Sequence, residues 1–166
     1  MRTLILLRHA KAVRETEAES DRARVLTERG HLDAAAAGAA IRAAGLKPAL
    51  LLVSPAARTL ETAALTGFAS VETLYEERLY HASASTIWEA AAEADVEHVM
   101  VVGHNPGLQE LVARLVESAR DHSRAGRALA GDLPTSAFAA FEIEGARLSG
   151  ARVRLLASWR PERRDE

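Results

Sequence analysis

Three short and almost wholly apolar runs divide the first two thirds of the chain. They cover residues 4–7, 50–53 and 99–102, and each ends at polar or turn-forming residues. The runs are too short for helices, and continuous apolar runs of this length are typical of strands covered on both faces, as in a parallel sheet. A weaker run at residues 70–75 predicts a fourth strand at an edge of that sheet.

Helical patterns lie between the predicted strands. Thr27 is placed to cap a helix that runs to about Ala44, with Gly45 past its end. The apolar face expected for this helix consists of Leu32, Ala35, Ala36, Ala39 and Ala43. Thr86 and Glu89 have capping-box spacing ahead of a shorter helix. A stripe with helical spacing consists of Leu108, Leu111, Val112, Leu115 and Val116. This alternation predicts an α/β three-layer sandwich with a mostly parallel central sheet.

The last third of the chain has a different pattern. Residues 120–134 are polar and rich in Gly and Ala, which predicts a long surface loop. Residues 137–144 and 151–158 alternate between apolar and polar positions more than the earlier runs do. We therefore expect them to pair as an antiparallel hairpin around residues 145–150.

Length and composition indicate an ordinary globular protein. The chain has 166 residues, of which 48% are hydrophobic and 27% charged, and we expect one domain over residues 1–160 with a charged, frayed tail at 161–166. The formal net charge of −2 favours neither a nucleic acid nor an anionic membrane as partner. The absence of cysteine excludes a disulfide, a thiolate metal site and a cysteine nucleophile.

The sequence also bears on the compartment. The apolar N-terminal run is too short for a secretion signal, and no stretch approaches the roughly 20 apolar residues needed to span a bilayer. We therefore expect a cytoplasmic protein.

Residues suited to phosphate chemistry follow each of the three strong runs. Arg8 and His9 follow the first, Ser54 and then Arg58 follow the second, and His104 follows the third. The carboxyl ends of parallel strands meet at one edge of the sheet, where open α/β sheets bind ligands. These side chains are therefore expected to converge.

Two of these junctions also carry helix-start signals. Ser54 and Asn105 can each cap a helix, and Pro55 and Pro106 suit the first helical position. Free backbone N–H groups at such helix starts, including the backbone at Asn105, favour an anion. With two guanidinium groups and two imidazoles nearby, a phosphoryl group is the expected occupant.

Two histidines at separate strand ends point to catalysis rather than to binding alone. A neutral imidazole is a competent nucleophile for phosphorus. In this hypothesis His9 attacks in line, His104, Arg8 and Arg58 stabilise the equatorial oxygens, and water then hydrolyses the phosphohistidine. The alternative for each residue taken alone is structural: a strand-end charge, a solvated helix residue or a turn residue.

These residues resemble the histidine phosphatase superfamily, the phosphoglycerate-mutase-like enzymes. The family pattern of a strand followed by Arg-His-Gly matches Arg8-His9-Ala10, with Ala10 in place of glycine. Residues 54–63 resemble the family's Ser-Pro-x-x-Arg-x-x-x-Thr-Ala, and residues 102–106 resemble its Gly-His block. The resemblance implies that His9 is the nucleophile, that Arg8, Arg58 and His104 form the phosphate pocket, and that neither a metal nor a cofactor is used.

A narrower resemblance is to the short phosphohistidine phosphatases of the SixA type, which have no large cap domain. Residues 21–30 and 134–137 carry this resemblance. It implies phosphohistidine in a protein, such as a histidine-phosphotransfer domain, as the substrate. A small phosphorylated metabolite with the same chemistry, and a non-catalytic module that only binds a phosphorylated ligand, are the alternatives.

The general acid is not fixed by any motif. Glu76 and Glu77 lie near the place where larger relatives carry one, and each could equally be a solvated charge. A missing acid would favour a P–N bond over an alkyl ester, because imidazole leaves more easily than an alkoxide. Arg24 could contact the substrate from above, or Asp21 and Arg24 could order the loop before the first helix.

The remaining histidines have no metal-like spacing with one another. They are expected to be surface or structural residues, with His81 as the one that could approach the pocket mouth: His31, His81, His98 and His122. There is also no P-loop and no Gly-x-Gly-x-x-Gly, which argues against a nucleotide triphosphate site.

Overall fold

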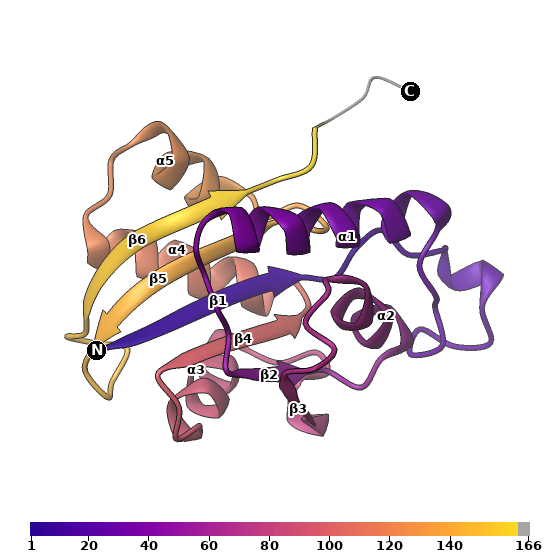
Figure 1. Cartoon of the computed structure of the whole chain (residues 1–166), viewed down its shortest axis with the longest axis horizontal. Coiled ribbons are helices and arrows are strands. Elements are labelled where there is room, and N and C mark those ends of the chain that lie inside the picture. Colours follow the sequence, from indigo (N-terminus) through magenta and orange to yellow (C-terminus); the bar gives the residue numbers. More distant parts are fainter. Residues whose placement is uncertain (163–166) are drawn as a thin grey trace.

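A single six-stranded sheet runs through the computed structural model, which describes residues 1–162; residues 163–166 of the predicted tail lie outside the described residues. The strand order is β3-β2-β4-β1-β5-β6 (Figure 1). Four strands are parallel: β1 (Arg2–Arg8), β2 (Leu50–Val53), β3 (Glu72–Tyr75) and β4 (His98–Gly103). The hairpin of β5 (Phe138–Glu144) and β6 (Arg152–Trp159) is antiparallel and pairs with β1. The predicted fold class, edge strand and hairpin are confirmed.

Helices cover both faces of the sheet. One face is covered by α1 (Glu28–Ala43) and α2 (Ala57–Leu65), and the other by α3 (Ala84–Glu93), α4 (Gly107–Ala119) and α5 (Arg124–Gly131). Successive strand side chains point to opposite faces, so Ile5 packs with Ile41 of α1 while Leu6 packs with Leu111 of α4. This two-sided burial explains the continuous apolar runs, and the α4 stripe is buried as predicted.

Helix α1 turns a different face to the core from the one predicted. Leu32 is 69% exposed, and the buried positions are instead Gly30, Ala34, Ala37, Gly38 and Ile41. A Cβ atom at Gly38 would lie 1.9 Å from the carbonyl oxygen of Thr66, so the two backbones are in contact there. Alanine occupies both buried and exposed positions of this helix, so hydrophobicity alone does not distinguish its buried face from its exposed face. The glycines that allow close approach leave no hydrophobic pattern.

Two further expectations are corrected. The predicted loop at residues 120–134 contains α5, whose N-cap Ser123 accepts a hydrogen bond from the backbone N–H of Gly126 at 3.1 Å. Only Leu129 on this helix is a large buried apolar residue, which is too little to create a visible period. The N-cap of α3 is Ser83 rather than Thr86, so this helix begins three residues earlier than predicted.

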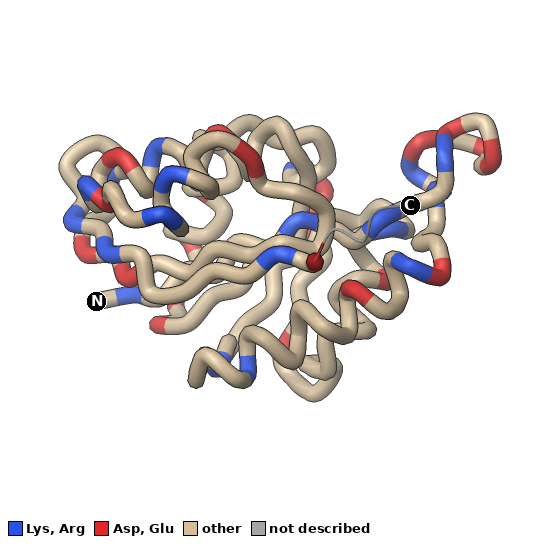
Figure 2. The backbone as a smooth tube through the Cα atoms, turned by 90° about the horizontal axis from the view of Figure 1, so that it is seen from above, with Lys and Arg blue, Asp and Glu red and all other residues tan. Residues whose placement is uncertain are grey.

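Loops of different length carry the chain across the carboxyl edge of the sheet, and the one between β1 and α1 is long. The 3-10 turns η1 (Glu15–Glu17) and η2 (Glu77–Leu79) lie in the loops that follow β1 and β3. Charges of both signs lie mainly on helices and loops, while the central strands are mostly uncharged (Figure 2). None of the helices within residues 1–162 is long and apolar enough to cross a membrane.

Candidate active site

The ends of β1, β2 and β4 meet at one edge of the sheet. The backbone N–H of His9 donates to the Gly103 carbonyl at 3.1 Å, and the N–H of Ser54 donates to the Val102 carbonyl at 3.1 Å. The ring centroids of His9 and His104 consequently lie 5.4 Å apart. The structure thus brings together two imidazoles that are far apart in the sequence.

His9 is held in the protonation state that a nucleophile requires. Its Nδ1 lies 2.8 Å from the carbonyl oxygen of Ala10, and since a carbonyl can only accept, the proton is on Nδ1 and the lone pair on Nε2. Burial lowers the pKa of His9 from 6.5 to about 4, and the positive charges of Arg58 and Arg8 add to this effect, which the Ala10 bond opposes. The imidazole is therefore neutral near pH 7.

Both guanidinium groups at the site keep a buried N–H without a protein partner. Arg8 donates from Nη1 to the Leu133 carbonyl at 3.2 Å, and Arg58 donates from Nη1 and Nη2 to the Asp21 carbonyl and carboxylate at 2.8 and 3.1 Å. The Nε atoms of both arginines are buried and have no hydrogen-bond acceptor among the residues described. Buried donors are normally paired, so these two groups indicate a binding place for an anion.

His104 faces the site with a similar unpartnered atom. Its Nε2 lies 2.7 Å from the hydroxyl oxygen of Ser54, while its Nδ1 is buried without a partner. The Ser54 side chain makes no other hydrogen bond within residues 1–162, so its proton is directed at Nε2 and the ring proton is on Nδ1. Burial, followed by the charge of Arg58, lowers the pKa of His104 to about 3. A neutral His104 can therefore donate from Nδ1 to a phosphoryl oxygen.

Thr62 explains part of the spacing in the Ser-Pro-x-x-Arg-x-x-x-Thr-Ala pattern of residues 54–63. Its hydroxyl donates to the carbonyl of Arg58 at 2.6 Å and accepts the backbone N–H of Ala10 at 2.9 Å. One turn of α2 thus connects the Arg58 position to the chain after β1. Ala10 does not adopt a positive φ, so its Cβ atom is accommodated where the family has glycine.

The helix starts differ from the predicted ones. The N-cap of α2 is Ala56, so Ser54 and Pro55 precede the helix, and the predicted capping residue Ser54 contacts His104 instead. The N-cap of α4 is Pro106 rather than Asn105. The Asn105 side chain still accepts the N–H of Gln109 at 3.1 Å, and the N–H of Leu108 donates to the His104 carbonyl at 3.1 Å, so both of these first-turn N–H groups are paired within the chain.

Asp21 lies at the centre of a hydrogen-bond network at the site. Its Oδ2 atom accepts from Arg58 at 3.1 Å and from the Tyr80 hydroxyl at 2.5 Å, and lies 3.3 Å from Nε2 of His81. Its Oδ1 atom accepts from Arg24 at 3.0 Å, while Nε of Arg24 donates to a loop carbonyl. The hydrogen bond from Tyr80 is the main reason why the pKa of Asp21 lies well below its usual range.

Sequence reasoning missed part of this network. Asp21 and Arg24 hydrogen-bond to each other, and Arg24 also bonds the Val13 carbonyl, as loop-ordering residues would; contact of Arg24 with the substrate stays a prediction. Tyr80 was not considered, although an aromatic residue with a hydroxyl beside the suspected acid positions is a usable signal. His81 was expected only to approach the pocket, whereas its ring stacks on that of His104 with centroids 6.0 Å apart.

The two glutamates considered as general acids lie apart from the four pocket side chains. Glu77 receives hydrogen bonds from Arg22 at 2.5 and 2.7 Å, and these bonds lower its pKa, which keeps it ionised. Glu76 pairs with Arg78 at 3.5 Å. Neither carboxylate has a contact with His9 or His104 in the part of the chain that the structure describes.

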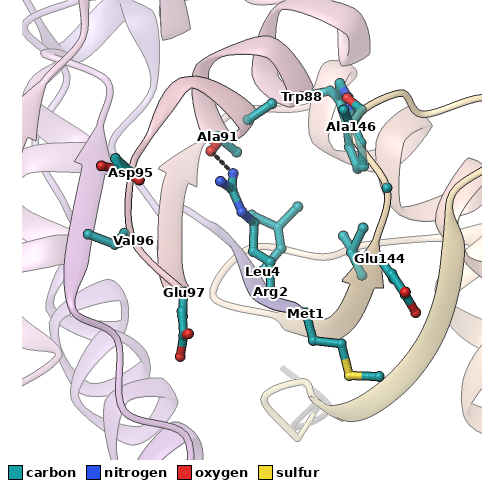
Figure 3. A pocket seen from close by; sticks show the side chains of 13 residues that line it. Met1, Arg2, Leu4, Trp88, Ala91, Asp95, Val96, Glu97, Glu144 and Ala146 are labelled. Atoms are coloured by element: carbon teal, nitrogen blue, oxygen red, sulfur yellow. Dashed lines mark hydrogen bonds between the residues drawn. The ribbon is translucent and has the colours of Figure 1, made fainter.

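Two hollows lie away from this site. One has a volume of about 560 Å³ and surrounds the start of β1, with Arg2, Leu4, Trp88 and Glu97 in its wall (Figure 3). The other, of about 610 Å³, lies between α3, α4 and the hairpin loop. Neither is lined by His9, Arg8, Arg58 or His104. The predicted phosphate-binding groups therefore lie at the sheet edge rather than in either of these hollows.

Comparison with known proteins agrees with this geometry. The family model described as histidine phosphatase superfamily (branch 1) matches residues 4–83. The structure of a candidate phosphohistidine phosphatase SixA from Nakamurella multipartitia is 35% identical, with 96% of both chains covered and a TM-score of 0.82. The chain belongs to the histidine phosphatase superfamily.

Two further relatives are similar over most of the chain. A candidate phosphohistidine phosphatase SixA from Agrobacterium tumefaciens is 29% identical, with 96% and 98% of the chains covered and a TM-score of 0.79. An uncharacterized protein of Mycobacterium tuberculosis is 30% identical over 141 residues, which cover 84% of this chain and 88% of that protein. Membership of the histidine phosphatase superfamily supports phosphatase activity.

Proposed function

We propose that the protein hydrolyses phosphohistidine in a partner protein, such as a histidine-phosphotransfer domain, through a covalent phosphohistidine on His9. The observation that carries this proposal is the neutral His9, with Nδ1 bound to the Ala10 carbonyl and Nε2 available beside unpartnered donors of Arg8, Arg58 and His104. A nucleophile and three oxyanion-binding groups at one place are what phosphoryl transfer requires.

The proposed reaction has two steps. In the first, the Nε2 lone pair of His9 attacks phosphorus, and the bond from phosphorus to the substrate's imidazole nitrogen breaks with its electron pair leaving on that nitrogen. In the second, water attacks the phosphorus, one proton of that water passes to a basic group at the site or to solvent, and the electron pair of the P–N bond returns to Nε2 of His9. Arg8, Arg58 and the Nδ1–H of His104 neutralise the charge that builds on the equatorial oxygens.

A protein substrate is favoured by where the site lies. The pocket groups stand at the carboxyl edge of the sheet, bordered by the loops after β1 and β3 and without a large cap, whereas the large cavities are elsewhere. A small metabolite is usually recognised by enclosing most of its surface, and a phosphohistidine presented by a folded partner does not need that. The two similar structures named as candidate SixA phosphatases agree with this choice.

The test compares two substrates with the wild-type enzyme and two variants. We expect wild-type protein to dephosphorylate a phosphohistidine protein and to do so faster than it hydrolyses an unactivated sugar phosphate. His9→Ala should abolish turnover while the circular dichroism spectrum stays that of a folded protein. The matched control is His122→Ala, which alters an exposed histidine outside the pocket and should keep full activity.

Two results would contradict the proposal. Equal rates on the sugar phosphate and on phosphohistidine would replace the protein substrate with a small phosphoester. Binding of phosphate without turnover of any substrate would make the protein a binding module. Trapping of phosphate on the wild-type chain but not on His9→Ala would support the covalent step.

A further inference from the structure

His81 has a left-handed backbone conformation. Its φ angle is 55°, in the region where residues other than glycine are uncommon, although histidine, asparagine and aspartate enter it more often than other side chains do. Residues held in this region cluster at functional sites. The conformation occurs at the turn after η2, which is the wall of the site formed by the loop that follows β3.

The contacts of His81 all belong to the site. Its ring is nearly parallel to that of His104, with an interplanar angle of 9° and centroids 6.0 Å apart. The edge-on ring of Tyr80 lies 4.1 Å away, and the Asp21 carboxylate lies 3.3 Å from Nε2. The side chain is nevertheless 60% exposed, in contrast to His9 and His104, which are 8% and 4% exposed. The imidazole of His81 thus forms the solvent side of a site whose nucleophile lies inside.

This order of groups follows the geometry of an in-line displacement. The leaving atom departs on the side of phosphorus opposite to the attacking nitrogen. Since His9 is buried beneath the site, that side is the exposed one, where His81 stands. An imidazole whose Nε2 is bound to a carboxylate has a second nitrogen that can exchange protons with a substrate or with water.

We propose that His81, held by Asp21, is the proton-transfer residue of this active site. The inference rests on the proposed phosphatase function and adds to it the residue that handles the proton. It assigns Asp21 and Tyr80 as positioning residues: Asp21 holds His81 and Arg58, and Tyr80 donates to Asp21 and packs edge-on against the rings of His81 and His104.

Protons balance over the two steps of the reaction. In the first step the lone pair of His9 forms the bond to phosphorus, the leaving atom keeps the electrons of its own bond, and protonated His81 transfers a proton to that atom. In the second step water attacks phosphorus, a water proton passes to His81, and the electron pair of the broken P–N bond returns to Nε2 of His9. His81 is then protonated again, and inorganic phosphate is released.

The neighbouring groups are less suited to this role. The Tyr80 hydroxyl already donates to Asp21, and burial together with that hydrogen bond raises its pKa. Glu77 is ionised and bound by Arg22. His104 lies between His9 and His81 with its Nε2 bound to Ser54, which suits it to the equatorial oxygens.

The test measures how the loss of His81 depends on the leaving group. Wild-type protein, His81→Asn and His81→Gly are assayed with phenyl phosphate, whose phenoxide leaves poorly without a proton, and with 2,4-dinitrophenyl phosphate, whose leaving group needs none. Asparagine and glycine both tolerate a positive φ, so both variants should fold with unchanged or higher stability. The ratio kcat/KM is compared because it reports phosphoryl transfer to His9 without the later hydrolysis step.

We expect kcat/KM on phenyl phosphate to fall about 100-fold or more in both variants, which is the usual contribution of a general acid. On 2,4-dinitrophenyl phosphate it should change little, and added imidazole should restore part of the phenyl phosphate activity of His81→Gly. The control His122→Asn should match wild type on both esters.

Three outcomes would overturn the assignment. The first is an equal loss on both esters, which would indicate a structural role. The second is no loss on either, and the third is no hydrolysis of either ester by wild-type protein. The proposed function is judged separately, by turnover of phosphohistidine and its dependence on His9, so its failure is distinguishable from that of the His81 assignment.

Discussion

Acidification to pH 5 should destabilise the folded protein because two buried histidines resist protonation. His9 and His104 have pKa values lowered from 6.5 to about 4 and about 3, whereas both titrate at the ordinary value once the chain unfolds. Between these values the unfolded state binds more protons than the folded state. Stability is therefore complete above about pH 6.5 and falls as the pH decreases toward 4.

The size of the loss follows from the two shifts. At about pH 5 each histidine is almost fully protonated in the unfolded chain and almost fully neutral in the folded one. With about 1.4 kcal/mol per pH unit between 6.5 and 5, each histidine contributes a loss of roughly 2 kcal/mol, and both together roughly 4 kcal/mol. Both side chains are more than nine-tenths buried, so solvent screening does not reduce this figure. Asp21, whose pKa is depressed, contributes only below about pH 4.

Urea unfolding at a series of pH values from about 7.5 to about 5 measures this loss of unfolding free energy directly. Wild-type protein should lose roughly 4 kcal/mol of unfolding free energy over that range, and His9→Asn about half as much, since one titrating group is removed. His122→Gln, which replaces an exposed histidine, should retain the wild-type pH dependence.

The reasoning would be refuted by a wild-type loss below about 1 kcal/mol over this range. It would be refuted equally by a His9→Asn variant with the full wild-type slope. Either result would mean that the histidines of the folded protein titrate near their ordinary value, and His9 would then not be held neutral by burial and the neighbouring arginines.

The structure supports two further predictions. Gly38→Ala should lower the unfolding free energy by roughly 3 kcal/mol, because the new Cβ atom would meet the Thr66 carbonyl. Gly131→Ala, where a Cβ atom would enter open space, should instead raise the unfolding free energy by up to about 1 kcal/mol, and urea unfolding of both variants tests the two values. Ser54→Ala should lower kcat about tenfold and move the ring proton of His104 partly from Nδ1 to Nε2, as read from ¹⁵N chemical shifts, and a wild-type ring already protonated on Nε2 would contradict this.

Much of the fold could be predicted because each apolar run carries a strong local signal. Strand β1 is apolar at four consecutive positions since both of its faces are covered, and α4 shows its period because large apolar residues alternate with polar ones. The face of α1 could not be predicted in the same way. Its packing depends on Gly30 and Gly38, whose small size allows backbone contact but leaves no hydrophobic trace.

The candidate site likewise has a part that the sequence predicts and a part that it does not. Arg8, His9 and His104 were predictable because each lies at a strand end or directly after one, and the place of these strand ends at the sheet edge is fixed by the parallel topology. Asp21, which joins Arg58 to the rest of the network, comes from a loop with no period. Its partners could not be derived from spacing, since loop conformation depends on contacts that form only in the folded chain.

This division has a chemical consequence. In the proposed mechanism the strand ends fix where the nucleophile and the phosphate-binding groups stand, so the capacity to form a phosphohistidine belongs to the sheet. The loops after β1 and β3 supply Asp21, Tyr80 and His81, which in that mechanism determine how protons reach the leaving group. A change confined to these loops should therefore alter which leaving groups are accepted while His9 remains the nucleophile. Exchange of residues 76–83 for the loop of a relative is expected to shift the preference between P–O and P–N substrates without abolishing phosphoryl transfer.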